Sequence, residues 1–398
     1  MTSKNINKLN ISLSFAGHAV ADFYESFAIG LIPLIAHKFK LSSYEVSLIA
    51  FLSIVPYSVQ FIFGYLTDRF GLKYLMVSSI LFSSIIISLL GIWQQFYVLL
   101  LIVFLANIGT SALHAPCVAL VGYIDDRKNK SLINSVFYLG GALGASIGPL
   151  LLIFIVESLG SKFIAITTIP GIILSIIFAR LIKEPKRLYK SREKNTHDSI
   201  SIKNNFFLFF KSINKIKIIF FLIISFAVYT CFLIIRILMT FLPLYYTQTS
   251  VSVIDVGKIL LIFGLIGGIG GLVFGYLADK TKQIYILQLI LFLSVILMFF
   301  IFKAHVLISV ILFVLLGFII TPITPICLSI SQRIFPNNIS FVSSLIIGLN
   351  AGLSGLTLIL VGKISDSIGI IKTINYVLIL PVIALMLLIF IKVFKRDL

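Results

Sequence analysis

The segment Phe63–Gly71, which reads FGYLTDRFG, recurs 211 residues later as FGYLADK at Phe274–Lys280. A second stretch, Ser131–Gly160, aligns without a gap on Ser340–Gly369 at an offset of 209. An offset that stays near 210 across both stretches indicates that the chain consists of two related halves. Internal repeats of this kind are frequent in polytopic membrane proteins, whose functional sites lie where the repeats meet.

The composition of the chain indicates a membrane protein. Hydrophobic residues make up 59% of the sequence and charged residues only 12%, whereas soluble domains carry about 25% charged residues. A spanning helix needs roughly 20 mostly apolar residues. We therefore predict an all-α membrane protein with twelve transmembrane helices, near residues 10–37, 44–66, 73–94, 96–123, 131–157, 160–182, 218–246, 253–278, 284–302, 306–332, 340–365 and 370–394.

The predicted helices fall into two pseudo-symmetric six-helix bundles. We expect an N-terminal bundle at 1–183, a basic cytoplasmic linker at 184–217 and a C-terminal bundle at 218–398. The net charge is +18, and 24 of the 32 Lys and Arg residues lie in the tails and in alternate connections. This asymmetry is the positive-inside pattern of cytoplasmic loops. It favours a multi-pass protein of the cell inner (plasma) membrane with both termini in the cytoplasm, and it needs no nucleic-acid partner.

The repeated segment carries a family resemblance. Gly64, Leu66, Asp68, Arg69, Gly71 and Lys73 match the loop signature Gly-x-Leu-x-Asp-Arg-x-Gly-Arg-Lys, and this stretch resembles the major facilitator superfamily. The resemblance covers essentially the whole chain. It implies two six-helix bundles that move a small molecule by alternating access, with helices 1, 4, 7 and 10 around a central cavity.

Three other motifs look like the fosmidomycin-resistance branch of drug exporters. They are His114–Pro116, the glycine-rich run Gly140–Pro149, and Arg236 ahead of Phe241–Tyr245. Two positions depart from the pattern of drug–proton antiporters. Leu152 stands where helix 5 would have its last glycine, and Lys282 replaces the final glycine of the second loop copy. These departures weaken the inference of drug export and leave the fold unaffected.

The resemblance assigns the repeated loops to a conformational latch. It implies that they join the cytoplasmic ends of the two halves in one state of the transport cycle. Asp68 can lie at a helix N-terminus, where anions are favoured, and Arg69 can reach Asp125 or Asp126. A solvated turn is the simpler interpretation. The predicted latch residues are Gly64, Asp68, Arg69, Gly71, Asp126, Asp279 and Lys280.

Charged residues at membrane depth are few, and helix 1 carries three of the titratable groups. His18, Asp22 and Glu25 fall within about 60° of one another at about 100° per residue, and Ser14 extends the same face. A charged group in the bilayer interior costs about 2.5–3.5 kcal/mol on insertion scales. This stripe must therefore face the protein interior or a water-filled cavity.

Arg236 in helix 7 lies near the repeat-equivalent position of Glu25. The resemblance implies that both, with His18, Asp22 and His114, share one polar chamber. An arginine favours the ionised form of a neighbouring carboxylate, and burial away from it favours the neutral form. We hypothesise that Asp22 or Glu25 binds the coupling proton with help from His18. Arg236 would hold an anionic substrate group, unless the pair is a static salt bridge.

Weaker candidates for substrate contacts follow from helix and depth alone. His114 fits a packing histidine as well as a substrate ligand. The softer candidates are Tyr24, Asn107, Tyr138 and Asn350. Glycines recur on helix 5 at positions 140, 141, 144 and 148, and on helix 8 at 264, 267, 268, 270 and 271. Small residues let membrane helices approach closely, so we expect both stripes at a sliding interface between the halves. Plain tight packing is the alternative, and both can hold.

These patterns predict a secondary transporter and not an enzyme. Proton-coupled export (antiport) of a drug-like or anionic compound comes first. An uptake symporter or facilitator for a small organic anion is the alternative, and a membrane receptor without transport is a third class. We expect a monomer that contacts substrate, protons and membrane lipid. No cofactor is expected, and no metal, because His-Glu-x-x-His is absent and the two membrane histidines lie on different helices.

Overall fold

The computed structural model describes residues 3–70, 72–92, 95–122, 130–182, 215–249, 251–335, 342–343 and 345–390, without the side chains of residues 3–7, 61, 65, 68–70, 122 and 130. The first half begins with α1 (Ser3–Gly30), α2 (Ile32–Phe39), α3 (Ser43–Ile54), the 3-10 segment η1 (Val55–Val59) and α4 (Gln60–Phe70). It continues with α5 (Leu72–Ser88), η2 (Leu89–Ile92), α6 (Phe96–Gly122), α7 (Lys130–Leu159), η3 (Ser161–Thr167) and α8 (Thr168–Leu181).

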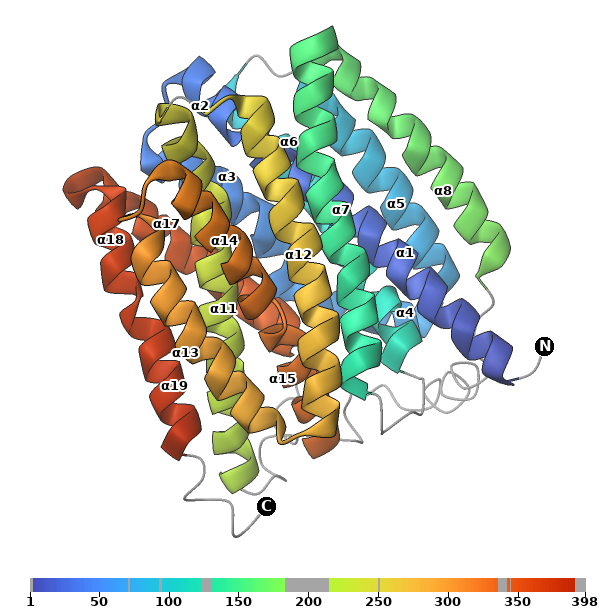
Figure 1. The fold of residues 1–398 in the computed structure, drawn as a ribbon. Helices are drawn as coiled ribbons and strands as arrows, with labels where there is room; N and C mark the ends of the chain where they lie inside the picture. The colour runs from blue at the N-terminus through green and yellow to red at the C-terminus, as the bar shows by residue number, and fades with distance from the viewer. Residues whose placement is uncertain are drawn as a thin grey trace.

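The second half repeats this plan beside the first (Figure 1). Its elements are α11 (Lys215–Gln248), α12 (Val253–Lys280), α13 (Gln283–Ile301), α14 (Val306–Ile320), α15 (Ile323–Ile334), the π-helical η4 (Leu345–Leu349), α17 (Asn350–Ile368), α18 (Ile370–Val377) and α19 (Ile379–Phe390). Of the predicted linker 184–217, the structure describes only 215–217, which already belong to α11.

Within the described ranges, eleven helices are long and apolar enough to cross a membrane, and Ser43–Val59 is a shorter apolar helix. The predicted second span falls on this shorter helix and on α4. Pro56 explains the interruption, because a proline lacks the amide hydrogen that an α-helix needs, and the chain runs as 3-10 helix at Val55–Val59. The all-α fold of two six-helix halves is confirmed.

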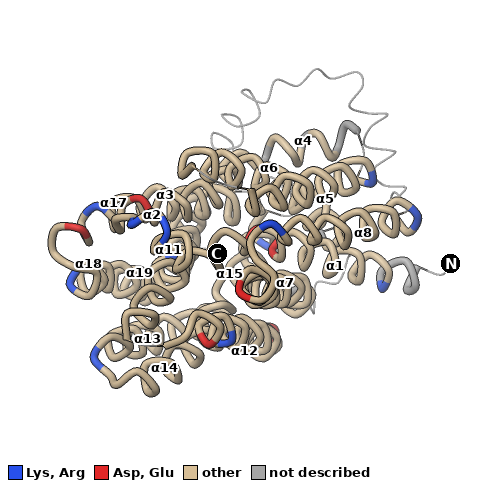
Figure 2. The backbone as a smooth tube through the Cα atoms, turned by 90° about the horizontal axis from the view of Figure 1, so that it is seen from above, with Lys and Arg blue, Asp and Glu red and all other residues tan. Residues whose placement is uncertain are grey.

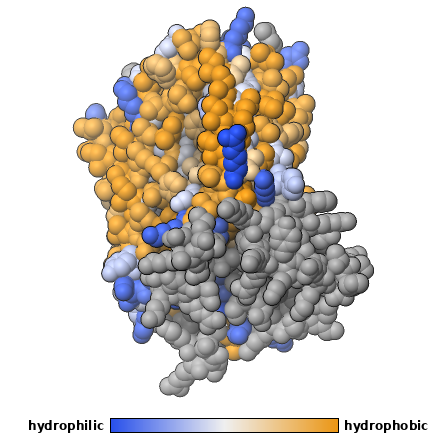
Figure 3. All heavy atoms as spheres, turned by 90° about the vertical axis from the view of Figure 1, so that its right-hand side faces the viewer, coloured by the Kyte–Doolittle hydropathy of each residue, from blue (hydrophilic) through white to orange (hydrophobic). Residues whose placement is uncertain are grey.

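The outer surface is apolar, as lipid contact requires. On α8 the exposed side chains include Ile169, Ile172, Ile173, Ile176 and Ile177. Apolar side chains cover most of the described part of the face in Figure 3, and charged residues are sparse along the chain in Figure 2. Lipid tails offer no hydrogen-bond partners, so the backbone amides and carbonyls of a spanning segment must bond to each other within the helix. The protein is therefore a multi-pass membrane protein.

Two antiparallel helix pairs join the halves: α7 with α12, and α3 with α17. The glycines of α12 partly meet the prediction, because Gly264 approaches Ala142 and Ser146 of α7. Helix 5 is α7 and does lie at this interface, but the prediction for its glycine stripe is wrong. A Cβ at Gly140 or Gly144 would collide with backbone oxygens of α1, which belongs to the same half. A small-residue stripe permits close packing but does not specify the neighbour.

The start of α3 is capped from the other half. Asp366, near the end of α17, accepts hydrogen bonds from the amides of Ser43 at 2.8 Å and Tyr44 at 3.1 Å. Within α3, Ser42 and Glu45 satisfy each other's amides in a capping box. All four free donors at this helix start therefore have an acceptor, two of them across the interface between the halves.

A second cap lies at the opposite end of the bundle, where α12 ends and α7 begins (Figure 1). Asp279 accepts from the amides of Ser131 at 3.4 Å and Leu132 at 3.0 Å, and Arg333 of α15 donates to the same carboxylate at 3.1 Å. The Asp279 side chain is buried. A carboxylate at a helix N-terminus is favoured by its amides and by the helix dipole. The two halves are thus joined at both ends of the bundle by aspartates of the second half.

We expect Asp279→Ala to loosen the contact between α7 and α12. Loss of a helix cap costs about 0.5–2 kcal/mol, enough to shift an equilibrium between two states by about two- to thirtyfold. The readout is the alkylation rate of Ser135→Cys, a buried α7 position whose hydroxyl lies against Gly275 of α12, with the native cysteines replaced by serine. The rate should rise in Asp279→Ala.

Lys280→Ala is the matched control for this prediction. Lys280 is exposed and its ammonium lies 5.6 Å from the ring centroid of Tyr276 on its own helix. Its removal should leave the alkylation rate unchanged. Equal rates in Asp279→Ala and in the parent protein would show that the cap does not hold the two halves together.

Candidate functional site

The charged stripe of α1 faces the interior, as its spacing predicts. His18 and Glu25 are buried, and the Asp22 side chain keeps 21% of its surface accessible. Ser14 extends the stripe and donates to the carbonyl of Cys117 at 2.6 Å. Positions four and three apart on a helix share one face, so α1 presents these groups side by side toward α6, α7 and the second half.

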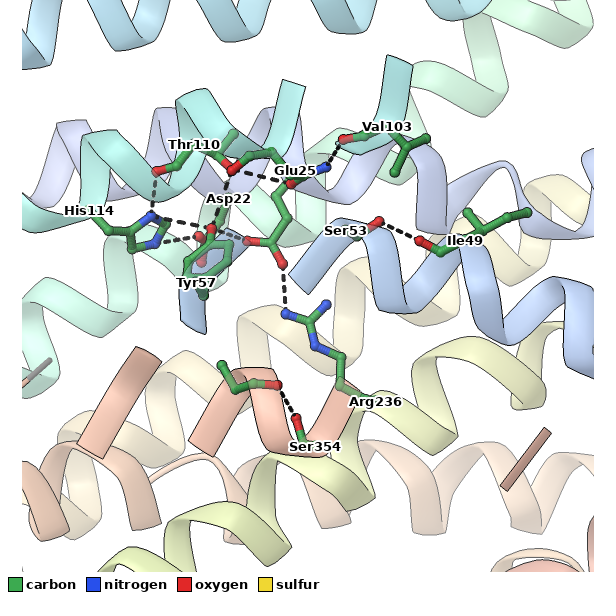
Figure 4. A network of polar contacts seen from close by, with 12 residues as sticks. Asp22, Glu25, Ile49, Ser53, Tyr57, Val103, Thr110, His114, Arg236 and Ser354 are labelled. Atoms are coloured by element: carbon green, nitrogen blue, oxygen red, sulfur yellow. Dashed lines mark hydrogen bonds and ion pairs between the residues drawn. The ribbon is translucent and has the colours of Figure 1, made fainter. Parts of the chain in front are cut away.

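The stripe divides into two centres. Figure 4 shows Asp22 beside His114 in one of them and Glu25 beside Arg236 in the other. In the first, which we call the histidine centre, Asp22 lies between His18 and His114. His18 Nε2 is 3.3 Å from Asp22 Oδ2, and His114 Nε2 is 3.0 Å from Asp22 Oδ1. The Nδ1 atoms turn away, to the carbonyl of Phe137 at 2.8 Å and that of Thr110 at 2.9 Å. Each imidazole is therefore held at both nitrogens.

The second centre, the arginine centre, spans the two halves. Arg236 of α11 donates from Nη2 to Glu25 Oε1 at 2.6 Å, with 14% of the arginine side chain and 10% of the glutamate side chain exposed. Tyr57 donates its hydroxyl to the other oxygen, Oε2, at 2.5 Å. Both carboxylate oxygens of Glu25 are thus engaged, one from each half of the protein.

Tyr57 reaches both centres because of the break at Pro56. The 3-10 turn at Val55–Val59 directs the ring toward α1 and α6, and Ser111 of α6 donates to the carbonyl of Pro56 at 3.0 Å. The Tyr57 oxygen also lies 3.3 Å from His114 Nδ1. Since its own hydrogen goes to Glu25, this oxygen can accept from His114. One phenol therefore links the histidine centre to the arginine centre.

Close packing of α7 on α1 completes the histidine centre. The ring of His18 stacks on Phe137, with centroids 4.0 Å apart. Gly141, one turn further along α7, faces the same point: a Cβ there would lie 2.6 Å from His18 Nε2 and closer still to Asp22 Oδ2. Only a residue without a side chain leaves room for both groups.

We expect Gly141→Ala to abolish or strongly reduce transport, because the added methyl group must displace His18, Asp22 or the whole of α7. Gly271→Ala is the control, since a Cβ at that membrane-helix glycine meets no other atom within 4 Å. Transport into proteoliposomes at matched protein amounts, with thermal unfolding measured in parallel, tests the prediction. Equal activity in both variants would contradict it.

The four softer substrate candidates lie in different places. Tyr24 is fully buried between α1 and η3 and donates to the carbonyl of Thr167 at 2.9 Å, so the structure does not bring it to either centre. Asn350 also lies apart from both centres, because it donates a hydrogen bond to Ser225 of α11 inside the second half. A one-residue change rotates a helix face by about 100°, which depth alone cannot predict.

The other two candidates lie close to the centres. Asn107 is buried on α6, and its side-chain oxygen accepts from Thr110 at 3.2 Å. Tyr138 has its ring centroid 5.5 Å from that of His18. Its hydroxyl is buried and has no hydrogen-bond partner among the described residues. Their contact with a substrate stays a prediction.

Of the predicted latch, Asp279 lies at the interface between the halves and Lys280 does not, since it points to the surface over Tyr276. Gly64 lies in α4, with open space where a Cβ would point. Gly71, Asp126 and the side chains of Asp68 and Arg69 lie outside the described residues. Their latch role stays a prediction.

Sequence reasoning missed Tyr57, Thr110, Arg333 and the capping role of Asp366. The signal for Asp366 was present, because Gly362–Gly369 repeats the Gly-x-x-x-Asp-x-x-Gly spacing of Gly64–Gly71. For Tyr57 the signal was a polar aromatic residue directly after a proline within an apolar run. Both clues needed the helix pairing before a partner could be named.

Two six-helix halves that meet at buried charged groups are an architecture typical of transporters built from internal repeats. The family model for the Major Facilitator Superfamily matches residues 14–346. The chain belongs to this superfamily, and it is a transporter of small molecules rather than an enzyme.

Individual relatives show the range of the family. The chain is 24% identical over 369 residues to the fosmidomycin resistance protein of Escherichia coli (strain K12), covering 90% of this chain and 86% of the relative. It is 23% identical over 171 residues to the cis,cis-muconate transport protein of Acinetobacter baylyi, covering 43% and 41%. The human organic anion transporter TETRAN has the same fold, with a TM-score of 0.72 at 13% identity over 96% of this chain and 99% of that one.

Proposed function

We propose that this protein couples proton movement to the transport of a small organic anion, with Glu25 as the proton site and Arg236 as the anion site. The observation that carries the proposal is the 2.6 Å ion pair between these residues, which belong to different halves. Alternating access moves the halves relative to each other, so this pair must change partners during the cycle. Arg236 is then free for a substrate anion, and Glu25 for a proton.

Charge balance sets the order of these exchanges. An anion that takes Arg236 leaves Glu25 without its counter-charge, in the neighbourhood of Asp22. Burying an unpaired carboxylate is far more costly than burying a neutral acid, so Glu25 then takes up a proton. Anion and proton therefore bind in the same state. This favours symport, with the anion following the proton gradient into the cell.

Export by antiport is the second candidate. It is favoured by similarity to the fosmidomycin resistance protein over most of both chains. Antiport requires substrate and proton to compete for one group, which the Glu25 carboxylate offers to a cationic or hydrogen-bond-donating drug. A role of His18 and Asp22 in proton transfer also stays a prediction.

We further propose that the protein resides in the plasma membrane as a monomer with cytoplasmic termini. The end of the bundle where α1 begins and α19 ends would then face the cytoplasm (Figure 1). The distribution of Lys and Arg supports this orientation. Proteolysis of the basic central segment from one side of right-side-out vesicles tests it.

The decisive experiment is transport in proteoliposomes that contain a pH-sensitive dye, with fosmidomycin and cis,cis-muconate among the probes. The sign of the pH change separates the two modes when only a substrate gradient is applied. Protons move with the anion in symport and against it in antiport. Anion movement without any proton movement would reject coupling and leave a facilitator.

A further inference from the structure

The imidazole rings of the histidine centre are oriented in a way that a proton-binding site does not require. The ligand atoms of His18, Asp22 and His114 all lie within 4.8 Å of one another. The two histidines come from α1 and α6, which are far apart in the sequence. Their separation argued against a metal when only the sequence was considered, and the packing of α6 on α1 removes that argument.

The hydrogen bonds of the two imidazoles decide which nitrogen is available. Carbonyl oxygens only accept, so the Nδ1 atoms that face Phe137 O and Thr110 O must carry hydrogen. In a neutral imidazole the hydrogen is then used, and Nε2 presents a lone pair. Both lone pairs point at the carboxylate of Asp22, at 3.3 and 3.0 Å. Three electron-rich groups therefore face one another, with their ligand atoms within 4.8 Å and each histidine beside a different carboxylate oxygen.

Either added protons or one cation must bridge these groups, because Nε2 lone pairs and a carboxylate only accept. Added protons on both rings would place two like charges in rings whose centroids are 4.7 Å apart. One divalent cation supplies the same charge at a single point and uses both lone pairs. Zinc bonds of about 2.0–2.1 Å separate neighbouring tetrahedral ligands by roughly 3.3 Å, close to the two distances observed here.

We propose that His18, Asp22 and His114 form a binding site for one divalent transition-metal ion of the zinc class. Two imidazole nitrogens select such ions over magnesium and calcium, which prefer oxygen ligands. The backbone carbonyls behind each ring fix its orientation, as outer-shell partners do in known sites. Only the Asp22 side of the site is accessible, at 21% against 5% for each histidine side chain.

The accessible side gives the ion a route and an open coordination position. Sites with three protein ligands and one open position bind water or an external ligand there. A donor atom of a transported compound can occupy that position. The metal site does not depend on the coupling proposed for Glu25 and Arg236, because none of its three ligands bonds directly to either residue among the described contacts.

The test is metal binding by the purified full-length protein, metal-stripped and carrying a tag without histidine. Titration with Co²⁺ should give the visible absorption of a tetrahedral site at one ion per chain, and Zn²⁺ should displace it while Mg²⁺ does not. Zn²⁺ should also raise the unfolding temperature by mass action. His114→Gln and His18→Gln should each weaken binding more than about 100-fold, beyond the 10–100-fold typical of outer-shell losses.

His305→Gln is the matched control, since His305 is exposed at the start of α14. If a histidine variant does not fold, Asp22→Asn replaces it, because an amide keeps the shape and removes the charge. Binding that is absent in the parent protein, or unchanged in the cluster variants, would overturn the metal site. Proton movement that persists in such a protein would leave the coupling proposal intact, so the two proposals fail separately.

Discussion

Glu25→Gln is expected to reduce substrate-driven proton movement to the level of empty liposomes while substrate exchange continues. Glutamine keeps the size and the hydrogen-bonding capacity of the side chain, but it cannot alternate between a charged and a neutral form. Arg236 then remains available to an anion in every state. Counterflow of labelled substrate should persist, and a pH gradient should no longer drive accumulation.

Glu157→Gln is the control for this result, because Glu157 is an exposed glutamate at the end of α7. It should transport like the parent protein. Asp22→Asn measured in the same assay identifies the coupling group. If Asp22→Asn loses proton movement and Glu25→Gln keeps it, the proton site lies in the histidine centre and the assignment to Glu25 is wrong.

Arg236→Gln is expected to destabilise the protein and to abolish transport. Removing one partner of a buried ion pair leaves the other charge uncompensated, which typically costs about 3–5 kcal/mol. Both side chains here are at least 86% buried, so solvent offers Glu25 little relief. Thermal unfolding in detergent and uptake into proteoliposomes measure the two effects.

The double variant Glu25→Gln with Arg236→Gln separates stability from function. It should recover much of the stability, because no charge is left unpaired, and it should still fail to transport. Lys258→Gln provides the surface comparison, since that lysine pairs with Asp255 at 58% exposure and its loss should not change unfolding measurably. A stable, inactive double variant with an equally stable Arg236→Gln would contradict the buried-pair argument.

The interior face of helix 1 was predictable, whereas its partners were not. The spacing of His18, Asp22 and Glu25 follows from the geometry of one helix, so no knowledge of the neighbours was needed. The division of the stripe into two centres depends on where α6 and α11 pack. A repeat offset placed Arg236 near the level of Glu25, but no sequence pattern paired His114 with Asp22.

Tyrosines and glycines show the same limit. Tyr24 belongs to the same helix as the stripe but bonds to Thr167 of η3, and Tyr57 reaches the centre from the 3-10 turn that contains Pro56. The glycines of α7 were correctly identified as contact positions, but they pack on α1 within their own half. Residue type reports what a position can accommodate, whereas the identity of the neighbour is a property of the whole packed bundle.

The caps made by Asp366 and Asp279 have a consequence for how this transporter can change during evolution. Each carboxylate accepts hydrogen bonds from backbone amides at the start of a helix. Every residue except proline provides such an amide. The side chains at the capped helix starts can therefore be substituted without loss of the contact. An alignment of relatives should therefore show no covariation between each aspartate and the residues that it caps. Selection should remove proline at either helix start.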